Sequence, residues 1–163
     1  NYLGTHSDKH LLYCDWTNRD SLLVTHQQFD QDIDHAFEEM KNWNITKRRA
    51  RYFLPPYEWY NDRIARWSRE AGLKLVCFTP GTRSNADYTY PEMGNKYLSG
   101  AGILGSIRLF EKESPDGLNG FILLLHIGTD PRRKDKMYFL LPGLIRELKS
   151  KGYRFVTIPQ LLR

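Results

Sequence analysis

The sequence has little cysteine. Cys14 and Cys77 are its only two, and neither belongs to a C-x-x-C or comparable metal-binding pattern, which excludes a disulfide framework and a cysteine-based metal site. No apolar run is long enough to cross a bilayer, and no basic, apolar, small-residue leader is present. No internal repeat is found either. We therefore expect two buried thiols and no membrane span.

Concentrated positive charge is also scarce, although the net charge is +5. Basic residues gather only at 47–51 and 132–136, and neither cluster alternates with aromatic residues as a platform for single-stranded nucleic acid does. We predict that both clusters are solvated loop faces. A nucleic-acid partner is not expected, and a nucleic-acid-binding function is a third hypothesis that depends only on the net charge and these two basic clusters.

What the sequence does contain is an alternation of strand and helix patterns. Its 163 residues, 40% of them hydrophobic, suit one domain. Helical periodicity is found at 25–43, 58–71, 103–112 and 137–151, the second and last of these helices ending at Gly72 and Gly152. Buried strands are predicted at 51–54, 73–78, 121–125 and 153–157, with a long loop at 79–99. This order is typical of an α/β fold with a parallel sheet or barrel.

Polar residues follow the predicted strands. Because ligands of parallel α/β folds bind at the carboxyl ends of strands, residues 5–6, 56–58, 79–87 and His126 are expected at one rim. His6 and His10 are four residues apart, so one helical turn would point both imidazoles at one cation such as zinc, cobalt or nickel. Such a pair also arises by chance. His126 is either a core histidine, with Asp130 as a structural partner, or a general acid or base.

Four segments, in order, resemble motifs of the polysaccharide deacetylases, carbohydrate esterase family 4, also called the NodB homology domain. Residues 6–10, His-Ser-Asp-Lys-His, resemble the family's His-Ser/Thr-x-x-His metal motif. Residues 53–58, Phe-Leu-Pro-Pro-Tyr-Glu, resemble Phe-Arg-Pro-Pro-Tyr-Gly. Residues 123–126, Leu-Leu-Leu-His, resemble the late motif that supplies a catalytic histidine, and Asp87-Tyr88 is a weak counterpart of an Asp-Trp pair.

The resemblance implies hydrolysis of an N- or O-acetyl group on a sugar, with a metal-activated water as nucleophile. It implies that His6 and His10 bind a divalent metal, with zinc expected and cobalt or nickel as alternatives. The backbone N–H of Tyr57 would hold the tetrahedral oxyanion, His126 would protonate the leaving amine or alcohol, and Asp87 would orient His126. A distorted (β/α) barrel, with parallel strands and outer helices, is the implied fold.

Substrate contacts carried over from the family fall on Leu125, which would touch the acetyl methyl, and on Tyr88. Two positions depart from the family. Leu54 replaces an arginine that holds the catalytic base, a role that the loop residue Arg83 could take over. Glu58 replaces a glycine and could replace a ligand, contact sugar hydroxyls, or cap the following helix at its favourable dipole end.

The family's first motif, Thr-Phe-Asp-Asp, supplies the base and the third metal ligand, and no adjacent Asp pair occurs in this chain. We therefore expect residues 1–163 to be a single deacetylase-like domain whose N-terminal strand and helix lie outside them, in a preceding segment or a second chain. The main hypothesis is a carbohydrate deacetylase, placed by the resemblance in the periplasm or outside the cell. The alternative is a catalytically inactive carbohydrate-binding pseudo-enzyme.

Overall fold

The computed structural model describes residues 1–162, which form two compact units. The first consists of Asn1–Cys77 and the chain from Val156 onward, and the second is Phe78–Phe155. Each unit has its own apolar core. The organisation of residues 1–163 as one domain stays a prediction. No helix of residues 1–162 has both the length and the apolar composition that crossing a membrane requires.

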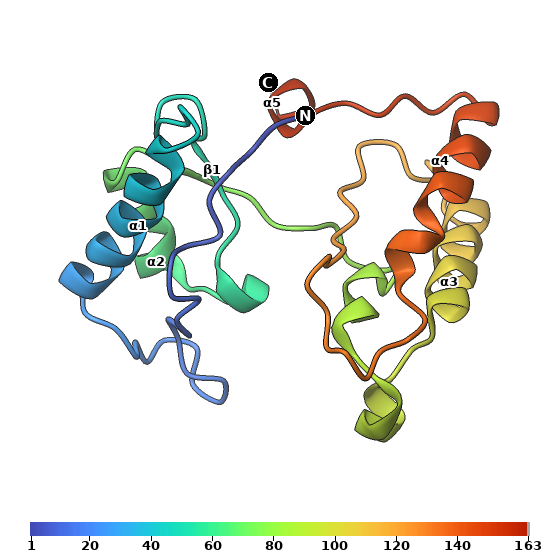
Figure 1. Ribbon diagram of the computed structural model, residues 1–163, viewed down its shortest axis with the longest axis horizontal. Coiled ribbons are helices and arrows are strands. Elements are labelled where there is room, and N and C mark those ends of the chain that lie inside the picture. The colour runs from blue at the N-terminus through green and yellow to red at the C-terminus, as the bar shows by residue number, and fades with distance from the viewer. Residues whose placement is uncertain (163) are drawn as a thin grey trace. The chain divides into compact units, whose positions relative to one another are not determined.

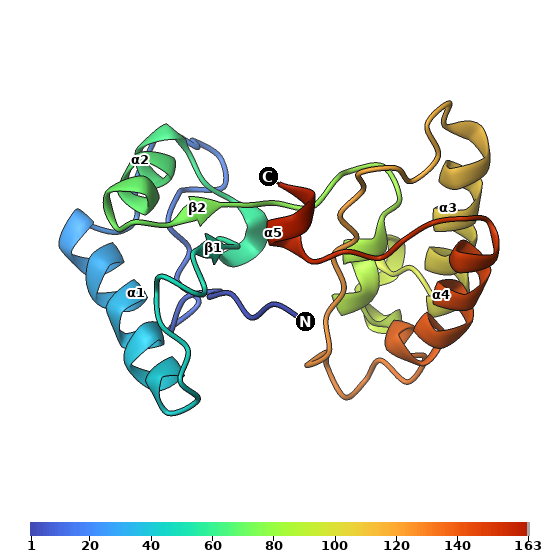
Figure 2. The ribbon, with the colours of Figure 1, turned by 90° about the horizontal axis from the view of Figure 1, so that it is seen from above.

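Parallel strands form the centre of the first unit. Strand β1 (Tyr52–Phe53) pairs in parallel with β2 (Lys74–Leu75), and Thr5 makes a parallel bridge to Phe53 on the other side. Both strands are drawn as short arrows in Figure 2. The parallel α/β character predicted from the sequence is confirmed, although β2 is much shorter than the apolar run at 73–78.

Helices α1 (His26–Lys41) and α2 (Asp62–Glu70) pack beside these strands and lie side by side in both views (Figures 1 and 2). Thr25 begins α1 with a capping box, in which its hydroxyl accepts the Gln28 N–H and the Gln28 side chain accepts the Thr25 N–H. The apolar spacing predicted from the sequence then buries Phe29 and Ile33 in the first core. Both predicted helices are therefore confirmed.

The ends of α2 show which residues define it. Its N-cap is Asn61, whose side chain accepts the N–H of Ile64, so the interpretation of Glu58 as the cap was wrong. At the other end Gly72 has φ +78°, and the N–H groups of Gly72 and Leu73 donate back into the last turn. This is a Schellman motif, which favours glycine because a left-handed conformation strains other residues. The predicted cap at Gly72 is confirmed.

The second unit is mainly helical. Helices α3 (Gly100–Glu113) and α4 (Leu141–Ser150) lie side by side in Figures 1 and 2, joined by an Arg108–Glu147 ion pair of 2.7 Å. Its shorter turns are η2 (Ser84–Tyr88), η3 (Pro91–Lys96) and η4 (Met137–Phe139). In the first unit, η1 (Pro56–Glu58) and the final helix α5 (Ile158–Leu161) complete the elements.

Two predicted strands, at 121–125 and 153–157, do not form within the part of the chain that the structure describes. Around Ile122 the chain contacts Thr79, which donates its N–H to the Ile122 carbonyl and accepts the Ile122 N–H on its hydroxyl. Soon after Thr79 the chain enters η2. Residues 121–125 therefore have only a short extended segment to pair with. Apolar content alone did not specify a strand there.

The basic cluster at 132–136 was predicted to be a solvated loop face. That prediction is wrong for part of the cluster. Arg133 is fully buried, and its Nη1 donates to the carbonyls of Thr89 (2.6 Å) and Leu98 (3.1 Å). Lys136 donates its ammonium to the Thr129 and Asp130 carbonyls. Two of the cationic groups therefore hold loops of the second unit together instead of forming an anion-binding surface.

Candidate active site

In the first unit, the imidazoles of His6 and His10 converge. Their Nε2 atoms lie 3.2 Å apart, and the two rings meet edge to face. The Nδ1–H of His6 donates to the backbone carbonyl of Leu54 at 2.7 Å. Since a carbonyl can only accept, this bond places a proton on Nδ1 of His6 and directs Nε2 to the side of His10.

The segment that brings the rings together is a loop, not the helical turn expected from their spacing. Ser7 and His10 both have positive φ, of 69° and 52°. The hydroxyl of Thr5 accepts the N–H of Ser7, and the hydroxyl of Ser7 accepts the N–H of His10. These side-chain bonds to the backbone stabilise the tight turn that replaces the helix.

Asp32 of α1 anchors this loop by hydrogen bonds. The sequence analysis did not identify this residue. Its carboxylate, 2% exposed, accepts the Lys9 N–H (2.8 Å) and the Tyr13 hydroxyl (2.9 Å). Burial, and to a lesser extent the nearby Asp32 charge, raises the pKa of Tyr13 far above its ordinary value. The Tyr13 hydroxyl therefore keeps its proton and donates it in the hydrogen bond to Asp32. The sequence contains one signal for this role of Asp32, because an acidic residue three positions after Phe29 lies on the apolar face of α1.

The separation of the two Nε2 atoms fits a shared cation. Two nitrogens at about 2.0–2.1 Å from a tetrahedral zinc ion lie about 3.3 Å apart, close to the 3.2 Å found. Residues 1–162 contain no group of three or more His, Cys, Asp or Glu side chains arranged to hold a metal. Within the described residues, the two imidazoles therefore converge without a third such side chain arranged to complete a metal site.

Tyr57 lies next to the histidine pair, with its ring edge to face on His10 at a centroid distance of 4.5 Å. Tyr57 and Glu58 both have left-handed backbone conformations, with φ of 59° and 52°. Pro55 and Pro56 precede them, and their carbonyls accept the N–H groups of Glu58 and Trp59. Two consecutive non-glycine residues in this region store strain, which is common at functional sites.

His126 and Asp87 are paired in the second unit. The Asp87 carboxylate, 1% exposed, accepts both the Nδ1–H and the backbone N–H of His126, each at 2.6 Å. The imidazole remains about one-third exposed. This two-point contact fixes the ring and leaves its Nε2 edge directed away from the carboxylate. Asp130, the structural partner considered from the sequence, pairs instead with Arg132.

The remaining predicted site residues of the second unit differ in their surroundings. The Tyr88 ring, 49% exposed, packs edge to face on His126 at 5.9 Å. Leu125 is half-buried against the second core. Arg83 is exposed and has a left-handed φ of 54° at the start of η2. The substrate roles assigned to these residues stay predictions.

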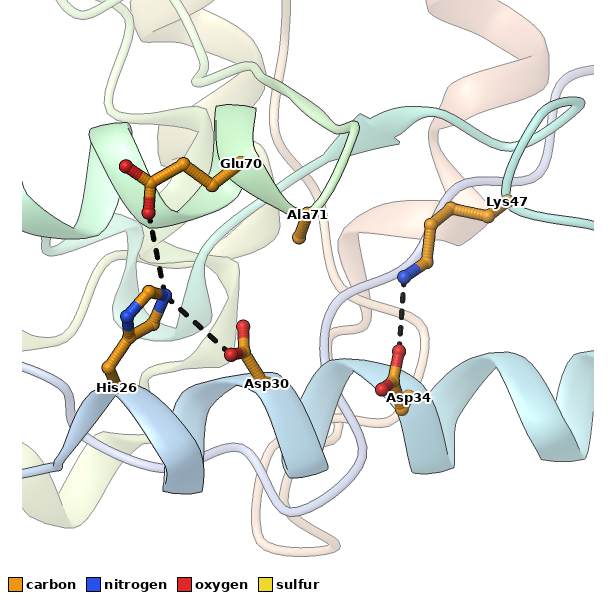
Figure 3. A pocket seen from close by; sticks show the side chains of 6 residues that line it. All are labelled: His26, Asp30, Asp34, Lys47, Glu70 and Ala71. Atoms are coloured by element: carbon orange, nitrogen blue, oxygen red, sulfur yellow. Dashed lines mark hydrogen bonds and ion pairs between the residues drawn. The ribbon is translucent and has the colours of Figure 1, made fainter.

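Away from these residues, a polar pocket of about 290 Å³ lies between α1 and α2. Figure 3 shows His26 directed toward Asp30 and Glu70, both 3.6 Å from its Nε2, and Lys47 directed toward Asp34 at 3.0 Å. The His26 ring also stacks on Trp67. His26 thus links α1 to α2 through its contacts with Glu70 and Trp67, and we assign no ligand to this pocket.

Comparison with solved structures identifies the class of the fold. The structure resembles a carbohydrate esterase family 4 pseudoenzyme from Bacillus anthracis, with a TM-score of 0.66 and 17% identity over 98% of this chain and 46% of that one. It also resembles a family 4 carbohydrate esterase from Streptomyces lividans solved with acetate, with a TM-score of 0.62 and 15% identity over 96% of this chain and 65% of that one. At these identities the likeness concerns the fold.

The sequence comparison agrees. The chain is 25% identical, over 161 residues, to a peptidoglycan-N-acetylglucosamine deacetylase of Bacillus cereus. That match covers 99% of this chain and 63% of the relative. No family model matches the chain. The predicted resemblance to polysaccharide deacetylases is confirmed, over less than two-thirds of this relative's length.

Proposed function

We propose that the protein is a metal-dependent deacetylase acting on an acetylated carbohydrate. The observation that carries this proposal is the pair of Nε2 atoms of His6 and His10 at 3.2 Å, with the His6 ring fixed by the Leu54 carbonyl. Such a hydrogen bond to the second ring nitrogen is the usual way in which proteins orient histidine ligands.

His6 and His10 would hold the divalent metal. Zinc is the expected ion, with cobalt or nickel as alternatives, because all three accept imidazole ligands. When bound, the metal supplies an activated water and polarises the acetyl carbonyl. We propose that a preceding segment, or a second chain, contributes the remaining ligand and the general base, and completes an incomplete (β/α) barrel. An Asp-Asp pair after an apolar strand, upstream in the same gene, would support this.

His126 is proposed as the general acid. Asp87 holds its Nδ1–H, so Nε2 can carry the proton that goes to the leaving amine or alcohol. The buried carboxylate also stabilises the imidazolium form that must exist before that transfer. The backbone N–H of Tyr57 is proposed to donate to the oxyanion that develops on the acetyl carbonyl, from a turn whose conformation is already set.

The substrate is proposed to be a carbohydrate chain, as for the Bacillus cereus relative, with Leu125 against the acetyl methyl. Tyr88, Glu58 and Arg83 are proposed to contact the sugar. An extracytoplasmic location follows from this proposal, since polymeric cell-surface glycans lie outside the cytoplasm.

A carbohydrate-binding pseudo-enzyme is the alternative, and one structural neighbour is a pseudoenzyme. It would account for Leu54 and Glu58 in place of the family's arginine and glycine. We favour the catalytic proposal because of two arrangements, the convergence of the His6 and His10 Nε2 atoms and the hydrogen bond between His126 and the Asp87 carboxylate. Carbohydrate binding alone would require neither of them.

The proposal is tested by acetate release from N-acetylglucosamine oligomers, using the longer gene product with added zinc or cobalt. We expect His126→Ala to lower kcat by about 10²–10⁴-fold, while His26→Ala, a histidine that only joins two helices, stays near wild type. Acetate release that is absent in the wild type, or undiminished in His126→Ala, would contradict the assignment.

A further inference from the structure

Beside the histidine pair, two aromatic rings face solvent. Trp16 is 55% exposed and Tyr57 is 46% exposed. Their rings meet edge to face at a centroid distance of 5.6 Å, and Tyr57 in turn contacts the ring of His10 at 4.5 Å. A continuous aromatic surface therefore leads from His10 to Trp16, within a single unit of the structure.

The loop that presents Trp16 is held in place by its own polar groups. The Asp15 carboxylate accepts the N–H groups of Thr17 and Asn18 and the hydroxyl of Thr17, and these bonds lower the pKa of Asp15. Cys14 and Leu22 make an antiparallel bridge at the base of the loop. A ring on such a loop loses little freedom when a ligand stacks on it.

Trp16 is supported from behind by Trp59. The two indoles lie 5.5 Å apart with a 32° tilt, and the Trp59 Nε1–H donates to the Asp15 carbonyl. The guanidinium of Arg19 lies 4.2 Å from the Trp59 ring centroid, and its Nε donates to the Tyr60 carbonyl. Trp59 is thus occupied by protein contacts, whereas Trp16 keeps an accessible surface.

We propose that Trp16, with Tyr57, forms a stacking subsite for the sugar ring next to the one that carries the reacting acetyl group. The apolar C–H face of a pyranose carries partial positive charge and packs on the negative face of an aromatic ring. Two rings provide an area suited to a single sugar and small for a protein partner. This inference depends on the proposed function, because the histidine pair defines where the reacting sugar lies.

The test compares binding of the N-acetylglucosamine monomer and tetramer by calorimetry, in EDTA so that the sugar is not consumed. The wild type should bind the tetramer more tightly than the monomer. Trp16→Ala should weaken tetramer binding about tenfold, in line with roughly 1.4 kcal/mol for one aromatic stack, and should leave monomer binding unchanged. Trp16→Phe should retain most of the affinity.

Trp43→Ala is the matched control, since Trp43 is 78% exposed and lies beyond the end of α1. Equal tetramer affinity in Trp16→Ala and wild type, an equal loss in Trp43→Ala, or no preference of the wild type for the tetramer would overturn the subsite. Tetramer binding that depends on Trp16, without acetate release by the zinc-loaded protein, would keep the subsite and reject the deacetylase activity. Normal acetate release with an unaffected Trp16→Ala would do the reverse.

Discussion

His6 lies in the first unit and His126 in the second. Each ring is oriented by a hydrogen bond from its Nδ1–H, but the two acceptors differ. The Nδ1–H of His6 donates to the neutral carbonyl of Leu54, and that of His126 donates to the buried carboxylate of Asp87. Both contacts place a proton on Nδ1 and turn Nε2 away from the acceptor.

The difference in partner suits two different tasks. Under the proposed function, the neutral carbonyl of Leu54 would orient His6 as a metal ligand without adding charge. The buried carboxylate of Asp87 would support His126 in its proposed role as a proton donor. If both proposed roles hold, the acceptor that Nδ1 contacts distinguishes the metal ligand from the acid in this protein.

Removing the charge of Asp87 should test this distinction most strongly. We expect Asp87→Asn to lower kcat by roughly ten- to hundredfold, because the amide has no charge to stabilise a protonated His126 and its NH2 group cannot accept one of the two N–H groups of His126. Acetate release measured together with thermal unfolding separates this from loss of structure. Normal activity in a folded Asp87→Asn protein would show that the carboxylate is not needed.

The support beneath the first histidine pair should give a smaller effect. Asp32→Ala leaves the Lys9 N–H and the Tyr13 hydroxyl without their buried acceptor, which should cost about 1–3 kcal/mol of unfolding free energy. Zinc affinity should fall with it, since the loop between His6 and His10 loses its anchor. Urea unfolding and zinc titration check both effects.

Tyr13→Phe is the control for Asp32→Ala, because it removes one of the two hydrogen bonds and leaves the Lys9 contact intact. It should be the milder variant in both measurements. Zinc affinity that is unchanged in Asp32→Ala would show that the loop holds its conformation unaided.

The smallest expected effect is a pH dependence confined to the second unit. Burial acts to raise the pKa of Asp135, but hydrogen bonds from the Gly100 N–H and the Tyr97 hydroxyl, with the Arg133 charge, hold it below its ordinary value. Its stabilisation is therefore complete above about pH 3.9 and is lost as the pH falls through the lower folded-state pKa.

The measurement is thermal unfolding between acid and neutral pH. Because Asp135 is partly exposed, the loss should be small and sensitive to salt. Asp135→Asn should unfold more easily than the wild type at neutral pH and should lack this part of the acid dependence. Identical acid profiles for both proteins would remove Asp135 from the account.

Local patterns in the sequence predicted local structure well. The apolar spacing around Phe29 and Ile33 gave helix α1, and Gly72 and Gly152 end their helices in left-handed conformations. Motif order predicted the resemblance to deacetylases, which the comparisons confirm. These features depend on a few neighbouring residues, so their physical causes are visible in the sequence.

Features that depend on distant partners could not be predicted in this way. The burial of Arg133 requires the carbonyls of Thr89 and Leu98, and the role of Asp32 requires a loop more than twenty residues earlier. The apolar run at 121–125 lacked a long strand partner and formed no strand in the described chain. The catalytic, substrate and metal roles of the site residues stay predictions.

The most direct test of the central claim is zinc binding by the longer gene product, measured by competition with a chelator. We predict that His6→Ala and His10→Ala each weaken zinc binding by at least about a hundredfold, because even outer-shell partners of zinc ligands contribute roughly ten- to hundredfold. His26→Ala, which removes a histidine that contacts Asp30 and Glu70 and not the loop between His6 and His10, should leave zinc affinity unchanged. Unchanged zinc affinity in His6→Ala and His10→Ala would contradict the metal site and the function proposed for it.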